Sequence, residues 1–234
     1  MEPAAGTEAN SGPPRAGFAL LWDIFIKPGR AYATILATRE WTLGLFAVVA
    51  ATFGAAALNG PALAHAALVA AKRGPAGAPA SGLLGQNPMA LGLVASWYTI
   101  ASLLVTAIVL QIAAMFRGQR RPFTLFLSLA VNCALPIYAG NLIGGLAVRL
   151  RDPASFSNLA QVARAFPESL AVFAPKAGDA EAIFLANFDL FALWSLLLLA
   201  FGFVRITGIS LVAALVLCFG IAFGLTLLGS WGSG

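Results

Sequence analysis

The sequence predicts an all-α integral membrane protein, a bundle of five transmembrane helices with amphipathic helices at the membrane interface. Of its 234 residues, 60% are hydrophobic and only 10% are charged, whereas about 25% of the residues in a soluble domain are charged. The mean hydropathy is +0.87. The apolar stretches are long and do not alternate in polarity as membrane β-strands do, so in lipid they must form helices. A soluble globule, a disordered chain and a coiled coil are excluded.

The N-terminal region divides into a tail and a pair of short helices. Residues 1–17 are rich in Ala, Gly, Pro and Glu and lack the apolar core of a signal peptide, so we expect a disordered tail. Residues 18–40 carry apolar side chains at helical spacing, interrupted at Lys27-Pro28-Gly29. Neither half can span a bilayer, so both are predicted to lie in the interface. Their predicted interfacial anchors are Asp23, Trp22, Pro28 and Tyr32.

Residues 41–234 form the predicted five-span membrane domain. The five spans are expected at about residues 41–58, 89–116, 123–148, 183–204 and 209–228. Asn59-Gly60-Pro61 is a turn signal that ends the first span. The apolar stretch 62–71 either extends that span beyond a kink or lies along the surface. In the loop before span four, Asp152-Pro153 predicts the start of another interfacial helix, which Pro167 ends.

The Lys and Arg residues lie at the ends of the apolar runs and predict the orientation. Eight fall on the side of the N-terminus and six on the other, and the densest group is at residues 117–121. The positive-inside rule therefore places the N-terminus in the cytoplasm and the C-terminus outside, as in a bacterial inner membrane protein. The basic residues form no stripe, which argues against nucleic-acid binding. The expected partners are membrane lipids and either a protein partner or a second copy of the chain.

Residues for catalysis or metal binding are scarce in this sequence. His65 is the only histidine, and no nucleophile elbow, phosphate-binding loop or dinucleotide motif is present. Cys133 and Cys218 each lie inside a predicted span and are interpreted as small core residues. We therefore expect a protein that is not an enzyme, with no catalytic residues, metal site or cofactor. A Ser–His pair that uses His65 is the catalytic alternative.

Two polar features within the spans are candidate functional or packing sites. Asp189 is the only acidic residue within a predicted span, where a charge costs about 2.5–3.5 kcal/mol. It is either an interfacial cap or part of a transport or partner-binding site. In span three, four residues recur at four-residue spacing and share one face, and Asn141 adjoins that face. That face consists of Asn132, Pro136, Gly140 and Gly144. It is either a packing seam or a polar cleft. Gly220 and Gly224 predict a second seam in span five.

Three segments together resemble the Yip-one (Ypt/Rab-interacting protein) domain family. They are Asp23-Ile24-Phe25-Ile26-Lys27-Pro28 followed by Tyr32, Ile35 and Trp41; Leu135-Pro136; and Asn187-Phe188-Asp189-Leu190-Phe191-Ala192-Leu193-Trp194. The resemblance runs from about residue 20 to the C-terminus and implies five spans with a cytoplasmic N-terminus. Eukaryotic members act in vesicle trafficking and bind Rab-type GTPases. This chain lacks their Asp-Leu-Tyr-Gly-Pro-like motif, is more similar to the prokaryotic branch, and is not expected to bind Rab proteins.

Two functions follow as hypotheses. The first is a non-enzymatic membrane protein that organises the bilayer or recruits partners through its interfacial helices. The second is a transporter or channel for a small solute or lipid, built around span three and Asp189. No inverted repeat is visible, and five spans do not divide into equal halves.

Overall fold

The predicted fold class is confirmed by a computed structural model, which describes residues 17–73, 87–167, 169–176 and 178–231. All but one residue of the expected tail 1–17 lie outside this part of the chain. Within it, every regular element is helical, and a single antiparallel bridge joins Ser169 to Asp189. The elements are α1 Phe18–Ile26, α2 Pro28–Thr38, α3 Thr42–Arg73, α5 Pro88–Phe116, α6 Phe123–Arg149, η1 Pro153–Ser155, α7 Leu159–Ala163, η2 Leu170–Phe173, α8 Asp179–Leu185, α9 Leu190–Thr207 and α10 Leu211–Trp231.

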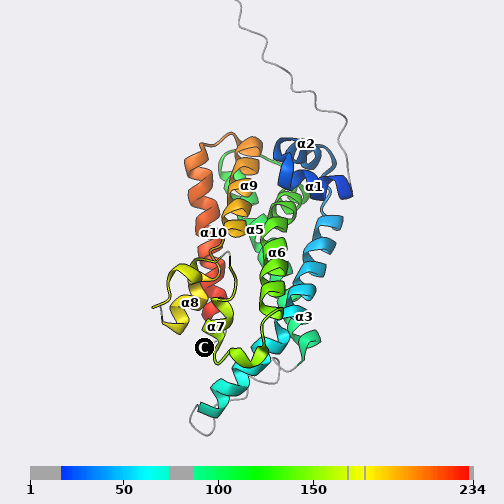
Figure 1. Cartoon of the computed structure of the whole chain (residues 1–234). Helices are drawn as coiled ribbons and strands as arrows, with labels where there is room; N and C mark the ends of the chain where they lie inside the picture. The colour runs from blue at the N-terminus through cyan, green and yellow to red at the C-terminus, as the bar shows by residue number, and fades with distance from the viewer. Residues whose placement is uncertain (1–16, 74–86, 168, 177, 232–234) are drawn as a thin grey trace, which may run out of the picture.

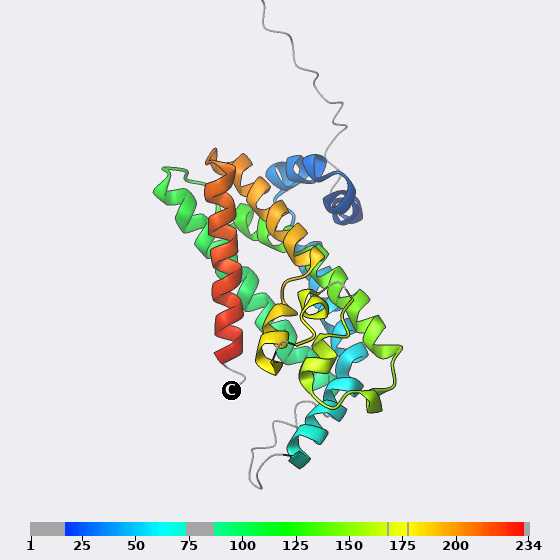
Figure 2. The same cartoon turned by 60° about the vertical axis from the view of Figure 1, so that its left-hand side comes forward.

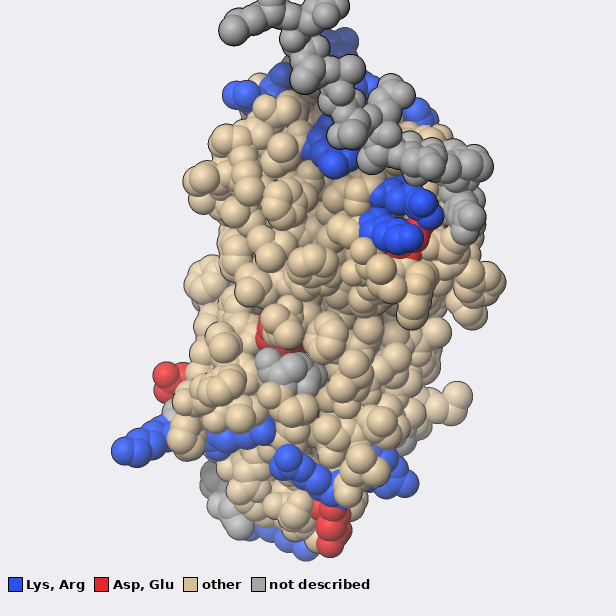
Figure 3. Space-filling view, turned by 45° about the horizontal axis from the view of Figure 1, so that its top comes forward, with Lys and Arg blue, Asp and Glu red and all other residues tan. Residues whose placement is uncertain are grey.

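Five of these helices are long and apolar enough to cross a membrane. They are Thr42–Val69 of α3, Met89–Phe116 of α5, Phe123–Arg149 of α6, Leu190–Thr207 of α9 and Leu211–Leu228 of α10. Even the shorter ones, with 18 residues, extend about 27 Å, close to the thickness of a hydrocarbon core. In the space-filling view, Lys and Arg gather toward the two ends of the molecule, and a largely uncharged band lies between them (Figure 3). The chain is therefore an integral membrane protein.

The long helices run along the bundle, and the short ones lie at its ends (Figure 1). α1 and α2 cover one end, and Figure 2 shows α2 lying crosswise to the spanning helices. η1, α7, η2 and α8 pack toward the opposite end. α6 is the central helix, because it packs against α3, α5 and α9 and also contacts α1 and α2. Most of α6 is buried, whereas little of α10 is.

The first spanning helix is longer than predicted. The turn expected at Asn59-Gly60-Pro61 does not form, and α3 continues through Pro61 to Arg73. The segment 62–71 therefore extends the helix. A proline removes one backbone N–H from a helix, and here tertiary packing outweighs that loss. Ala62 and Ala66 are buried against Val148 and Phe156, and His65 Nδ1 lies 3.0 Å from the Phe156 carbonyl oxygen.

The fourth span begins later than predicted, at residue 190 instead of 183. The chain forms α8, leaves the helix near Asn187, and starts α9 with Asp189 as the N-cap. Between the two helices, the Phe188 carbonyl accepts a hydrogen bond from the Leu170 N–H (3.0 Å). Apolar composition alone does not show such a break, because both helices are hydrophobic. The interfacial helix expected from Asp152 to Pro167 is also divided, into η1 and α7.

Candidate functional site

The four predicted residues of the span-three face, from Asn132 to Gly144, lie on the buried face of α6. Asn132 is fully buried, and its Nδ2 donates to the carbonyl oxygens of Glu40 (2.9 Å) and Ser128 (2.8 Å). The Ser128 hydroxyl donates to the same Glu40 carbonyl (2.6 Å). Glu40 lies two residues before the first residue of α3, so these bonds attach the start of α3 to α6. A Cβ atom on Gly44 would lie 2.8 Å from Asn132 Oδ1, which shows how closely the two helices approach.

Pro136 marks a cross-link between α6 and α9. A proline ring crowds the carbonyl of the preceding turn and opens the helix locally. The N–H of the next residue, Ile137, donates to the Ser195 hydroxyl oxygen at 3.2 Å. Ser195 is buried within α9. Sequence reasoning missed this serine, although a lone serine in an apolar span one residue after Trp194 is a usable signal.

The two glycines of the α6 face are both buried. A Cβ on Gly140 would lie 2.6 Å from Cδ2 of Phe191, so the aromatic ring occupies the space beside this glycine. Trp194 lies one turn further along α9 and is 38% exposed. The seam predicted from Gly220 and Gly224 differs, because a Cβ on either residue would meet no described atom within 4 Å. Those two glycines therefore do not pack against another helix in the described part of the chain.

Asp189 is a helix cap at the start of α9. Its Oδ1 accepts a hydrogen bond from the Ala192 N–H (2.6 Å), which satisfies one of the free donors of the first turn. Burial raises the pKa of the carboxyl above its ordinary value of 3.8, while hydrogen bonds from the Ala192 and Phe191 backbones act in the opposite direction. The structure thus brings Asp189 to the end of a span and not to its interior.

The predicted interfacial anchors lie on a paired unit, α1–α2, at one end of the bundle. Trp22 is 68% exposed, whereas Asp23 on the next position is buried. Pro28 occupies the first turn of α2, where a missing N–H costs nothing. The buried Tyr32 donates its hydroxyl to the Leu198 carbonyl oxygen of α9 (2.7 Å). The Arg205 guanidinium carbon lies 5.7 Å from the Tyr32 ring centroid, a cation–π distance.

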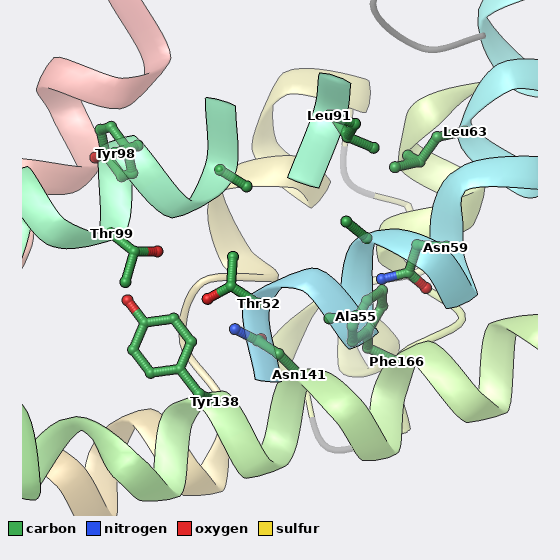
Figure 4. A pocket seen from close by; sticks show the side chains of 12 residues that line it. Thr52, Ala55, Asn59, Leu63, Leu91, Tyr98, Thr99, Tyr138, Asn141 and Phe166 are labelled. Carbon is green, nitrogen blue, oxygen red and sulfur yellow. The ribbon is translucent and has the colours of Figure 1, made fainter. Parts of the chain in front are cut away.

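Asn141 lies apart from the packed face and lines a cavity of about 290 Å³ between α3, α5 and α6 (Figure 4). Tyr138, one turn earlier on α6, lines the same cavity. Asp189 is not among the lining residues, so it does not share this cavity with Asn141. Among the described residues, no group of three or more His, Cys, Asp or Glu side chains could hold a metal ion.

Together, the fold and these contacts define a polytopic α-helical membrane protein with a tightly packed central helix. The family is shown by sequence comparison: residues 22–232 match the model of the Yip1 domain. The chain belongs to the Yip1 domain family, as the three sequence segments indicate. Searches of curated proteins and of solved structures found no match.

Proposed function

We propose that this protein is a non-enzymatic organiser of the membrane, which acts through the α1–α2 unit in the headgroup layer of one leaflet. The observation that carries the proposal is the division of α1 into two faces. Leu20 and Ile24 are buried against the bundle, while the opposite face of the helix projects apolar side chains away from it. Those outward side chains are Phe18 (79% exposed), Trp22 (68%), Phe25 (37%) and Ile26 (55%).

The charge distribution of this end of the bundle suits a membrane surface. Lys27, Arg30 and Arg39 belong to or flank α2, and Arg205 lies beside Tyr32. Basic residues next to an apolar face favour the anionic cytoplasmic leaflet by about 1 kcal/mol each. An aromatic residue such as Trp22 is favoured at headgroup depth. These preferences agree with an N-terminus in the cytoplasm, and a reporter enzyme fused to each terminus tests that orientation.

The rigid attachment of the α1–α2 unit distinguishes it from a loose amphipathic anchor. Tyr32 is bonded to α9, and Ala31 and Ile35 are buried beside it in the same core. Movement of the unit would leave the Tyr32 hydroxyl without its acceptor. The apolar face of α1 is therefore held at a constant depth relative to the spans. Apolar side chains of α1 that insert into one leaflet at a fixed depth change its lipid packing and curvature. The same helix also offers a surface to partner proteins.

The proposal is tested by reconstituting the full chain in vesicles that contain anionic lipid and measuring vesicle diameter against protein density. The double variant Phe18→Gln/Trp22→Gln removes two exposed side chains and leaves the buried contacts of α1 intact. We expect it to lose the effect on vesicle diameter that the wild type has. Phe116→Gln is the matched control, because Phe116 is 86% exposed at the same end of the bundle but belongs to α5.

An unchanged vesicle diameter with wild-type protein at any density would refute membrane organisation. Equal activity of the wild type and the double variant would show instead that the spans act without α1. Partner recruitment is followed in the same variants by identifying proteins that co-purify from native membranes in nanodiscs. A stoichiometric partner that the wild type and Phe116→Gln retain, and the double variant loses, would extend the proposal to an adaptor.

A further inference from the structure

The cavity between α3, α5 and α6 is embedded in the membrane-spanning part of the bundle. Eleven of its twelve lining residues belong to candidate spans, and the other is Phe166, after α7. Tyr98 is 47% exposed and also lines the cavity, so the cavity is not sealed on the side of α5. The Tyr98 hydroxyl donates to the Leu225 carbonyl oxygen of α10 (2.8 Å). This bond joins α5 to α10 at the rim.

Polar side chains from all three helices turn toward a common space. Figure 4 shows the polar ends of Thr52, Thr99, Tyr138 and Asn141 directed toward one another. Thr52 Oγ1 donates to the Val48 carbonyl oxygen of its own helix (2.9 Å) and can still accept a hydrogen bond. The apolar side of the cavity is formed by residues such as Leu63, Leu91 and Phe166. The cavity therefore has a hydrogen-bonding side around Tyr138 and a more apolar side, on which Asn59 is the polar residue.

Two amides of the lining have hydrogen-bonding capacity that the described residues leave unused. Asn59 Oδ1 is buried and has no partner among them. The Asn141 side chain likewise makes no hydrogen bond within the described part of the chain, although it can form up to four. Surrounding hydrocarbon cannot supply partners, and an unsatisfied polar group there costs several kcal/mol. An occupant that forms hydrogen bonds relieves this cost.

The lining also determines the charge of the occupant. Among the described residues, no Lys, Arg, Asp, Glu or His lines the cavity, so an ion would lie in a low-dielectric site without a counter-charge from them. Hydroxyl and amide groups both donate and accept, which suits hydroxyl and ester oxygens. A volume of about 290 Å³ lies at the small end of ligand pockets, which measure about 300–1,000 Å³. That volume holds a glycerol unit with its ester groups, but it is too small for two acyl chains as well. The acyl chains must therefore extend out of the cavity on the side of α5 that is not sealed.

We propose that the cavity binds the uncharged glycerol–ester head of a neutral glyceride such as diacylglycerol, with Asn141, Tyr138 and Thr99 as its hydrogen-bonding groups. This site is separate from the α1–α2 unit and does not depend on the function proposed for it. The occupant must be uncharged, must carry hydroxyl or ester groups, and must reach the cavity from the membrane.

The experiment uses full-length protein in nanodiscs and a diacylglycerol that carries a photoreactive diazirine in one acyl chain. Labelling of the wild type is expected to saturate and to be competed by unlabelled diacylglycerol. Asn141→Leu and Tyr138→Phe should each weaken binding about threefold to tenfold, the effect of losing one hydrogen bond. Thr106→Val is the matched control, because this buried α5 threonine bonds to Ser102 of its own helix and does not line the cavity.

The competition arms identify the source of the bound group. Competition by free glycerol at millimolar concentration would support the hydrogen-bonding chemistry of the cavity. It would, however, identify the bound molecule as a soluble polyol instead of a glyceride. Equal competition by phosphatidylglycerol, which carries a charge, would overturn the proposal. So would labelling that does not saturate, or equal labelling of wild type, Tyr138→Phe and Thr106→Val. Tyr138→Phe keeps the ring and removes one hydroxyl, so it decides the question even if Asn141→Leu fails to fold.

Discussion

The packing of Gly140 against Phe191 gives a quantitative prediction, because the sequence contains a matched glycine for comparison. An alanine Cβ at position 140 would lie 2.6 Å from Cδ2, 2.8 Å from Cγ and 3.0 Å from Cβ of Phe191. These distances are below van der Waals contact, so the ring and its Cβ atom must shift to make room for the new methyl group. Overpacking of this kind costs about 1–3 kcal/mol. Replacing glycine with alanine within a helix offsets up to about 1 kcal/mol.

Gly220→Ala carries the same gain in helix propensity without the steric cost, because a Cβ there meets nothing within 4 Å. We therefore expect Gly140→Ala to be less stable than Gly220→Ala by about 1–3 kcal/mol. The free energies of unfolding are measured in mixed micelles by titration with denaturing detergent, with circular dichroism as the readout. Phe191→Leu in the Gly140→Ala background should restore part of the loss, because the two residues are in contact. Equal stability of the two alanine variants would refute the packing argument.

Two further contacts give predictions of the same kind. Ser195→Ala leaves the Ile137 N–H without its acceptor and should destabilise the protein by about 0.6–1.7 kcal/mol in the same titration. Ser96→Ala is the control, because Ser96 is equally buried and its hydroxyl has no hydrogen-bond partner among the described residues. It should cost less, and an equal cost would contradict the cross-link. Burial raises the pKa of Asp189 in the folded state, so the folded protein holds this proton more tightly than the unfolded chain. Stability should therefore fall as pH rises from about 3.8 through the folded-state pKa. Asp189→Asn retains the cap and should abolish this decline; a decline that persists in the variant would show that another group is responsible.

The sequence predicts the helices better than it predicts their ends. Hydropathy finds all five spans, because only helices satisfy the backbone in lipid. It cannot show that Pro61 stays within α3, since the reason lies in burial of Ala62 and Ala66 against a segment about 90 residues later. At Asp189, in contrast, the sequence contains the relevant local signal. The capping signal is local and readable, but the apolar residues on both sides conceal the break between α8 and α9.

The candidate sites divide in the same way. Spacing places Asn132, Pro136 and Gly140 on one face of α6, and the structure buries that face. Spacing alone treats Gly220 and Gly224 as equivalent to this seam, although no helix packs against them in the described structure. The cavity could not be predicted, because its lining residues come from three spans whose rotation about their own axes is set by tertiary packing. Ser195 stands out in the sequence as a lone serine in an apolar span, but the same packing decides which helix it faces.

The most direct test of the central claim measures the depth of α1 in the bilayer. Trp22→Cys is labelled with a nitroxide in the full chain; both native cysteines, Cys133 and Cys218, are buried and protected from the reagent. Paramagnetic accessibility should place the label about 5–10 Å into the boundary between headgroups and acyl chains, with oxygen favoured over a water-soluble nickel complex. A label at the exposed Arg120, in the turn between α5 and α6, should show the opposite preference. If the label at position 22 is as accessible to nickel as the label at position 120, then α1 lies in water and the proposed function is contradicted.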